Sequence, residues 1–193
     1  MSSRDQIIAN VKANKPQALP LPEIPDFGPD PAQTFTRFSD SLAFVGGQLV
    51  ELPAGQTVAD VVRERFPDAQ RIAASVPLAG IPLMPVDAQT PKETLEQVDV
   101  AVLQGVFGVG ENAAIWVPEA NMPHRSLPFI AQHLVLVIDR YTIVPNMHEA
   151  YRQIDKTSLS YGVFIAGPSK TADIEQSLVV GAHGARSLTV LVR

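Results

Sequence analysis

The residues best suited to chemistry lie near the C-terminus, just after a short apolar run. Ser169, Lys170 and Thr171 directly precede a predicted helix over 173–180. The start of a helix has free N–H groups and the positive end of a dipole, so two hydroxyls and one ammonium there suit a carboxylate or a phosphate. Asp173 in the first helical turn adds a candidate catalytic acid. The alternative is that these side chains only cap the helix.

Four more residues complete the candidate site. His183 and Arg186 follow the predicted helix in a glycine-rich turn, as a candidate catalytic group and a candidate anion ligand. Glu111 lies in a loop between two predicted strands, where ligands collect in open α/β sheets, and could act as a base or orient a polar substrate. Arg125, before a short helix, could hold a carboxylate through two hydrogen bonds. The structural alternatives are a turn acid for Glu111 and a surface ion pair for Arg125.

Composition excludes several classes of function. The chain has 193 residues, no cysteine, a formal net charge of −5 and a pI near 5.3. Without cysteine it cannot form disulfides, thiolate zinc sites or cysteine-ligated iron–sulfur clusters. The acidic balance argues against a nucleic-acid partner, which normally meets a basic face. We therefore expect no cofactor bound by this chain and no nucleic-acid partner.

Signals for membranes, metals and nucleotides are also weak. No apolar run reaches the roughly 18 residues that span a bilayer, and the first residues lack the apolar core of a signal peptide, so we expect no membrane insertion and a cytoplasmic location. The four histidines have no metal-ligand spacing. The glycines at 105, 108 and 110 stand in the wrong order for a dinucleotide loop, and Pro168 stands where a P-loop needs lysine. Charged residues make up only 18%, which favours a surface covered by a partner or by a second copy in a homo-oligomer.

An α/β fold must position the candidate residues. The apolar runs over 98–106, 134–139 and 162–166 are continuous, which is typical of strands covered on both faces in a parallel sheet. Further strands are predicted over 48–52, 71–75, 113–117 and 188–192. The short connection before the strand over 113–117 predicts an antiparallel hairpin with its predecessor. The predicted fold class is therefore α/β, with a mixed, mostly parallel sheet flanked by helices.

Helices are predicted where capping residues precede an apolar stripe. They start at Asp30-Pro31, Thr57, Thr90-Pro91 and Asn146, with a short helix over 126–131. Thr90-Pro91 is the clearest start, because a cap, a first-turn proline and a capping acid stand together there.

Residues 1–32 differ in composition from the rest of the chain. A helix with an apolar stripe of Ile7, Ile8 and Val11 is predicted first, and six prolines follow before position 32. We therefore predict an N-terminal helix with a proline-rich linker over 1–32 and an α/β domain over 33–193. The helix could dock on a neighbouring subunit or partner, or pack back on its own domain.

Two C-terminal motifs carry a family resemblance. They are Gly-Pro-Ser-Lys-Thr-Ala-Asp-Ile-Glu over 167–175 and Leu-Val-Val-Gly-Ala-His-Gly-Ala-Arg over 178–186. The pair resembles the LUD domain family, and within it the lactate utilization protein C group. Looser agreement upstream, through Arg125-Ser126-Leu127-Pro128, extends the resemblance over about 35–193.

The resemblance implies an α/β fold similar to the sugar-phosphate isomerase and CoA-transferase superfamily. It also implies a role in oxidising L-lactate to pyruvate together with two iron–sulfur partner proteins, LutA- and LutB-like. The absence of cysteine agrees with this division of labour, because the clusters would then be held only by the partners. The family match strengthens Ser169, Thr171, Asp173, His183 and Arg186 as site residues.

One stretch departs from the family pattern. Where the family usually has Glu-Thr-Gly, this chain has Glu111-Asn112-Ala113, so a hydroxyl and a glycine are lost. The departure favours an altered substrate or a non-catalytic subunit. Three functions stay open: a lactate utilization subunit that handles a small monocarboxylate, a stand-alone enzyme or binding protein for a sugar phosphate, folate or CoA ester, and a regulatory or scaffold module.

Overall fold

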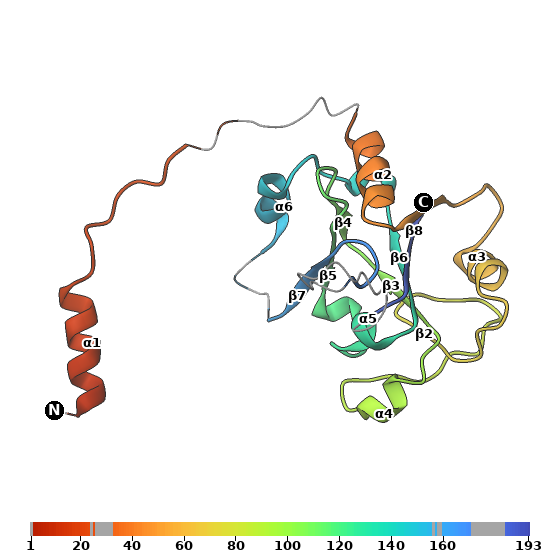
Figure 1. The fold of residues 1–193 in the computed structure, drawn as a ribbon, viewed down its shortest axis with the longest axis horizontal. Coiled ribbons are helices and arrows are strands. Elements are labelled where there is room, and N and C mark those ends of the chain that lie inside the picture. Colours follow the sequence, from red (N-terminus) through yellow and green to blue (C-terminus); the bar gives the residue numbers. More distant parts are fainter. Residues whose placement is uncertain (1, 24, 26–32, 156, 158–159, 171–183) are drawn as a thin grey trace.

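The fold is seen in a computed structural model that describes residues 2–23, 25, 33–155, 157, 160–170 and 184–193 (Figure 1). Its helices are α1 (Ser3–Ala13), α2 (Thr34–Phe44), α3 (Val58–Arg65), α4 (Lys92–Leu95), α5 (Leu127–Ile130) and α6 (Met147–Gln153). Its strands are β1 (Gln48–Glu51), β2 (Ile72–Ala74), β3 (Val100–Gln104), β4 (Phe107–Gly108), β5 (Ile115–Pro118), β6 (His133–Ile138), β7 (Gly162–Ile165) and β8 (Ser187–Val192).

The strands form two sheets. Five of them make a parallel sheet in the order β1-β8-β6-β3-β2, and three make an antiparallel sheet in the order β4-β5-β7. Because β1 and β8 are the first and last strands among the described residues and are hydrogen-bonded, the sheet joins the start and the end of the described domain. The predicted α/β class with a mostly parallel sheet flanked by helices is confirmed.

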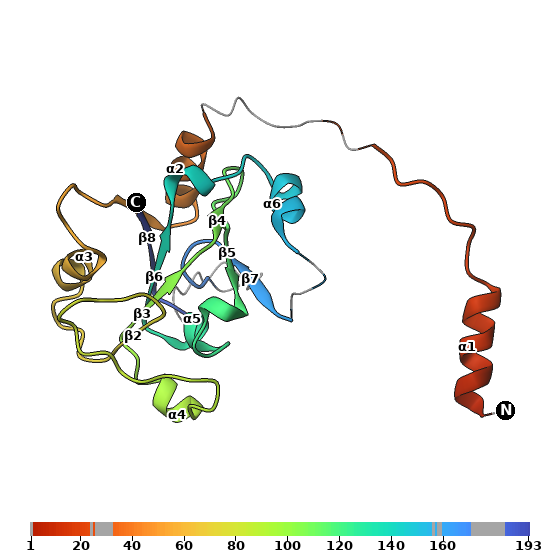
Figure 2. The same ribbon diagram turned by 180° about the vertical axis from the view of Figure 1, so that it is seen from behind.

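The two faces of the parallel sheet are covered by different layers. Along β6, Leu134, Leu136 and Ile138 belong to the core cluster that includes α2 and the antiparallel sheet, whereas Val135 and Val137 belong to the cluster that includes α3. This alternation follows from the two-residue period of a strand. Figures 1 and 2 show α3 on one side of the parallel sheet and β4, β5 and β7 on the other.

The antiparallel strands differ from the prediction. The strand predicted over 98–106 ends at Gln104, and the hairpin is made by β4 and β5. A Cβ on Gly105 would lie 2.5 Å from Cγ2 of Ile115, so this position accepts only glycine where the chain crosses between the sheets. The prediction of a parallel strand over 162–166 is wrong, because β7 pairs antiparallel with β5 and packs Phe164 on Trp116, with ring centroids 4.8 Å apart.

The predicted capping box at the start of α3 is present, whereas the helix predicted from Thr90 is short and has no side-chain cap. The Thr57 hydroxyl accepts from the Asp60 amide at 3.2 Å, and the Asp60 carboxylate accepts from the Thr57 amide at 2.9 Å, which completes a capping box. At α4 the Thr90 hydroxyl donates instead to Asp87, and the helix ends after four residues. The predicted helix start at Asp30-Pro31 and the predicted helix over 173–180 lie outside the described residues.

The N-terminal helix is present as predicted and starts with a capping box between Ser2 and Asp5. None of its residues is buried, and Ile7 and Val11 are 61% and 67% exposed. The helix stands away from both sheets in Figure 2, so it is not packed back on its own domain.

Candidate functional site

The turn after β7 brings part of the predicted site to the edge where the parallel strands begin. Gly167 has φ +73°, and a Cβ there would lie 2.7 Å from the carbonyl oxygen of Val45, just before β1. The Ser169 amide donates to the carbonyl of Ala185, just before β8, at 2.9 Å. The turn is therefore fastened to the amino ends of β1 and β8 by a close backbone approach and a hydrogen bond.

A cavity of about 270 Å³ opens beside this turn, and we call it the signature cavity. It is lined by Pro128, Phe129, Leu134, Phe164, Ile165, Ala166, Gly167, Pro168, Ser169, Lys170, Gly184 and Ala185. Its walls are apolar apart from the hydroxyl of Ser169 and the exposed ammonium of Lys170. Two predicted ligand-binding residues thus meet in one cavity. Thr171, Asp173 and His183 lie outside the described residues, so their roles stay predictions.

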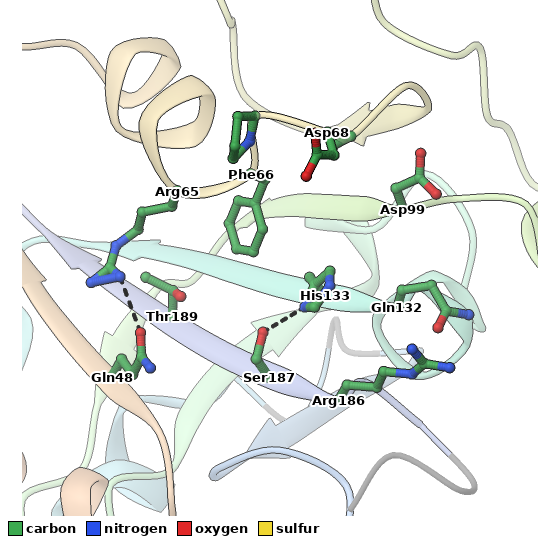
Figure 3. A pocket seen from close by; sticks show the side chains of 12 residues that line it. Gln48, Arg65, Phe66, Asp68, Asp99, Gln132, His133, Arg186, Ser187 and Thr189 are labelled. Carbon is green, nitrogen blue, oxygen red and sulfur yellow. Dashed lines mark hydrogen bonds between the residues drawn. The ribbon is translucent and has the colours of Figure 1, made fainter.

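The predicted ligand residue Arg186 lines a different cavity, of about 540 Å³, which we call the amino-edge cavity (Figure 3). The lining comes from the first residues of the parallel strands and the turn after α3: Gln48, Arg65, Phe66, Pro67, Asp68, Ala69, Asp99, Gln132, His133, Arg186, Ser187 and Thr189. Arg186 was predicted to bind a ligand together with Ser169 and Lys170. In the structure Arg186 lines the amino-edge cavity, whereas Ser169 and Lys170 line the signature cavity.

Strand alternation explains why the two cavities lie on opposite faces. His133 and Ser187 are direct partners in the register of β6 and β8, and both face the α3 side. The next residue of β6, Leu134, faces the other way and lines the signature cavity. A shift of one residue along a strand therefore moves a side chain from one cavity to the other.

His133 is an ionisable side chain of the amino-edge cavity whose pKa is shifted by its surroundings. Its Nδ1 lies 2.8 Å from the hydroxyl of Ser187, and its ring packs on Phe66 with centroids 5.1 Å apart. Burial lowers the pKa of His133, the positive charge of Arg186 lowers it further, and Asp99 opposes the change. A neutral imidazole held between a hydroxyl and an aromatic ring suits hydrogen bonding to a ligand.

Two other charged residues of this cavity are already engaged. The Asp99 carboxylate accepts the amides of Gln70 and Arg71, both at 2.8 Å, and Arg65 donates to the Gln48 side chain at 3.0 Å. Sequence reasoning missed this cavity, apart from Arg186. The available signal was that His133 and Ser187 directly precede two predicted strands, where a parallel sheet brings them side by side.

Glu111 and Arg125 contribute to neither cavity lining. The Glu111 carboxylate accepts the amide of Met147 at 2.9 Å, at the first residue of α6, and Ser41 donates to the backbone carbonyls of Gly110 and Glu111. Arg125 donates to Glu119 at 2.5 Å and lies over the ring of Tyr161. Both side chains thus have the partners that their structural alternatives require, and their roles in a site stay predictions.

The sequence matches the family model of the LUD domain over residues 47–192. The chain belongs to the LUD domain family. Two relatives bear the name "Lactate utilization protein C": that of Geobacillus sp. is 35% identical over 50% of this chain and 43% of its own length, and that of Oceanobacillus iheyensis is 30% identical over 55% and 49%. The matched segments span less than half of these relatives.

A solved structure extends the likeness to three dimensions. The crystal structure of a DUF162 family protein from Deinococcus radiodurans superimposes with a TM-score of 0.63 over 85% of this chain and 98% of its own, at 18% identity. This likeness establishes a shared fold. The LUD match includes every strand of both sheets and the described residues of both cavities.

The LUD domain of this chain has an unusual backbone where its sequence departs from the family pattern. Ala113, where the resemblance expects glycine, has φ +57°, the left-handed region that glycine adopts most easily. Asn112 supports the turn by accepting the amide of Ala114 at 3.0 Å. This loop thus has a left-handed backbone at Ala113 although the residue there is alanine.

Neither a metal centre nor a membrane span emerges from the described residues of this LUD protein. No group of three or more histidine and acidic side chains among them is arranged to hold a metal ion. The same residues contain no helix that is both long and apolar enough to cross a bilayer.

Proposed function

We propose that this LUD protein serves lactate utilization, supporting the oxidation of L-lactate to pyruvate together with LutA- and LutB-like iron–sulfur proteins. The observation that carries the proposal is the LUD match over 47–192 combined with relatives named lactate utilization protein C. The oxidation releases two electrons and two protons, so it needs an electron acceptor. A chain with no cysteine leaves cysteine-ligated clusters to partner proteins.

The signature cavity supports the same proposal chemically. Lactate and pyruvate are small monocarboxylates with an apolar methyl group. The Lys170 ammonium and the Ser169 hydroxyl offer donors for a carboxylate, and the apolar side chains of Phe129 and Leu134 line the cavity where the methyl group would lie. The cavity volume of about 270 Å³ lies just below the roughly 300–1,000 Å³ of sites for drug-sized ligands, as a small acid requires.

Genetic complementation tests the role. A strain that lacks this chain should fail to grow on L-lactate, and the wild-type chain should restore growth. Lys170→Ala should restore it poorly if Lys170 holds the carboxylate, whereas Lys92→Ala, which removes another exposed lysine, should restore it fully. Normal growth of the deletion strain on L-lactate would sink the proposal.

Affinity purification tests the partners in the same strain. The tagged full chain should bring down the two iron–sulfur proteins, with clusters visible in the absorption spectrum of the eluate. A thermal shift with a sugar phosphate, folate or CoA ester, absent with L-lactate and lost in Lys170→Ala, would instead favour a stand-alone protein for another anion.

A further inference from the structure

The amino-edge cavity has the size of a ligand site and is separate from the signature cavity. Its volume of about 540 Å³ falls within the roughly 300–1,000 Å³ that small-molecule sites occupy. Its floor is made by the amino ends of β1, β8 and β6, and its roof by the end of α3 and the turn after it (Figure 3).

The floor of this cavity is polar on an otherwise apolar face. Deeper along the same face, β6 carries Val135 and Val137 and β8 carries Leu191. At the strand starts the pattern changes, and the paired positions are His133 with Ser187 and Gln48 with Thr189. Hydrogen-bonding side chains thus gather where the sheet meets the cavity, as sites with a few convergent polar groups do.

One cation of the cavity is available to a ligand. Arg65 is held by Gln48 at one end of the cavity. In the part of the chain that the structure describes, the Arg186 guanidinium at the other end has no hydrogen-bonded side-chain partner. Arg186 lies near enough to His133 for its charge to act on the imidazole. A guanidinium binds an oxyanion through two parallel hydrogen bonds, which makes Arg186 the natural anchor.

An aromatic ring lines the same cavity as this anchor. The Phe66 ring descends from the roof onto the floor at His133 (Figure 3). Phe66 is half-buried, so part of its surface is open to the cavity. An aromatic ring and a cation in one cavity suit a ligand that joins a flat ring to an acidic group.

We propose that the amino-edge cavity binds a ring-bearing organic anion, with its oxyanion on Arg186 and His133 and its ring against Phe66. The oxyanion can be a carboxylate or a phosphate ester, which share this chemistry. The site is independent of the proposed lactate role, because none of its lining residues lines the signature cavity.

Calorimetry on the purified full chain tests the site with four probes: benzoate, phenyl phosphate, inorganic phosphate and L-lactate. Benzoate or phenyl phosphate should bind, and whichever binds more tightly identifies the acid group. Arg186→Gln should raise the Kd by about tenfold or more, the usual weight of a charge-assisted hydrogen-bonded contact. Arg193→Gln, which removes an exposed arginine at the opposite edge of the sheet, should leave the Kd unchanged.

Two further measurements locate the ring and the acid. Phe66→Leu should weaken benzoate or phenyl phosphate, with its fold checked by circular dichroism because Phe66 also packs against the α3 side of the core. The ring protons of His133, assigned by their loss in His133→Gln, should shift when the ring probe binds. A bound anion should also raise the pKa of His133, because it offsets the charge of Arg186.

Three outcomes overturn this proposal. The first is that neither ring probe binds at millimolar concentration. The second is that inorganic phosphate binds as tightly as phenyl phosphate. The third is that binding survives Arg186→Gln but is lost in Lys170→Ala, which would move the ligand to the signature cavity. A failure of L-lactate to bind in the signature cavity would affect only the proposed function.

Discussion

The two cavities lie back to back across the amino ends of β6 and β8, yet they are built in different ways. The signature cavity takes most of its lining from two short stretches, 164–170 and 184–185. The amino-edge cavity draws on separated positions between Gln48 and Thr189. Within one continuous stretch, Ala185 lines the first cavity and Arg186 the second. A motif that is contiguous in sequence can therefore serve two sites, because the sheet separates them.

The cavities also differ in charge. The signature cavity has one lysine among mostly apolar side chains. The amino-edge cavity has two arginines, two aspartates and a histidine, which come from strand starts, the end of α3 and the turn after it. A small acid with a methyl group matches the first, whereas a larger anion with several polar contacts matches the second.

The largest effect is expected for Gly167→Ala, which should detach the signature turn from β1. The left-handed φ costs alanine about 1–2 kcal/mol, and the approach to the Val45 carbonyl adds an overpacking cost of about 1–3 kcal/mol. The free energy of unfolding measured in urea should fall by the sum of these two costs. Gly55→Ala is the matched control, because Gly55 has φ +83° with no atom within 4 Å of the added Cβ.

Equal losses of stability in the two glycine variants would contradict the close approach at Gly167. Because the two cavities are separate, Gly167→Ala should affect only the signature cavity. Binding that depends on Lys170 should weaken, while the NMR signals of His133 should stay where they are.

The contrast between the cavities also explains what the sequence could predict. Continuous apolar runs identify β3 and β6 because covered parallel strands need no polar face, and capping residues locate α3 because their effect is local. Ser169 and Lys170 were found through a contiguous motif. His133 and Phe66 were not, because 66 residues of chain separate them and only the sheet register and the end of α3 bring them together.

The antiparallel sheet shows the same limit. Phe107 and Gly108 form a strand of two residues, which is too short to give a period, and the run over 162–166 is as apolar as a parallel strand. Its antiparallel pairing depends on the tertiary contact between Phe164 and Trp116. Propensity and periodicity carry no information about that contact.

A smaller effect is expected for Glu111→Ala, which tests a residue outside both cavities. Loss of the acceptor for the Met147 amide and of a negative charge at the start of α6 should lower the free energy of unfolding by about 0.5–1 kcal/mol. Glu111→Gln, which keeps an acceptor oxygen, should lose less. Loss of growth on L-lactate with unchanged stability would instead restore Glu111 as a functional residue.

The difference in pH-dependent stability between wild type and His133→Gln should report on the amino-edge cavity. Because the pKa of His133 is lower in the folded chain than its usual value of 6.5, the unfolded chain binds the extra proton more readily. The stability from neutral His133 is therefore complete above about pH 6.5 and is lost as the pH falls through the folded pKa. Unfolding free energies of wild type and His133→Gln should converge at low pH.

Arg186→Gln sharpens this measurement. Removing the nearby positive charge should raise the pKa of His133 toward its usual value, as an NMR titration of the imidazole protons would show. Lys170→Ala should leave the titration unchanged if the sheet isolates the two cavities. An equal shift in both variants would mean that one electrostatic site spans both faces.

The smallest effect is expected for Arg125→Gln, which tests whether Arg125 forms only a surface ion pair or also binds a ligand. Arg125 and Glu119 form an exposed pair beside Tyr161, and Arg125 lines neither the signature cavity nor the amino-edge cavity. Such pairs are weakened by solvent and salt, so the midpoint of urea unfolding should barely change. Calorimetry should give the wild-type Kd for every probe that binds. An increase in Kd comparable to that of Arg186→Gln would place Arg125 at a binding site and would break the assignment of binding to the two cavities.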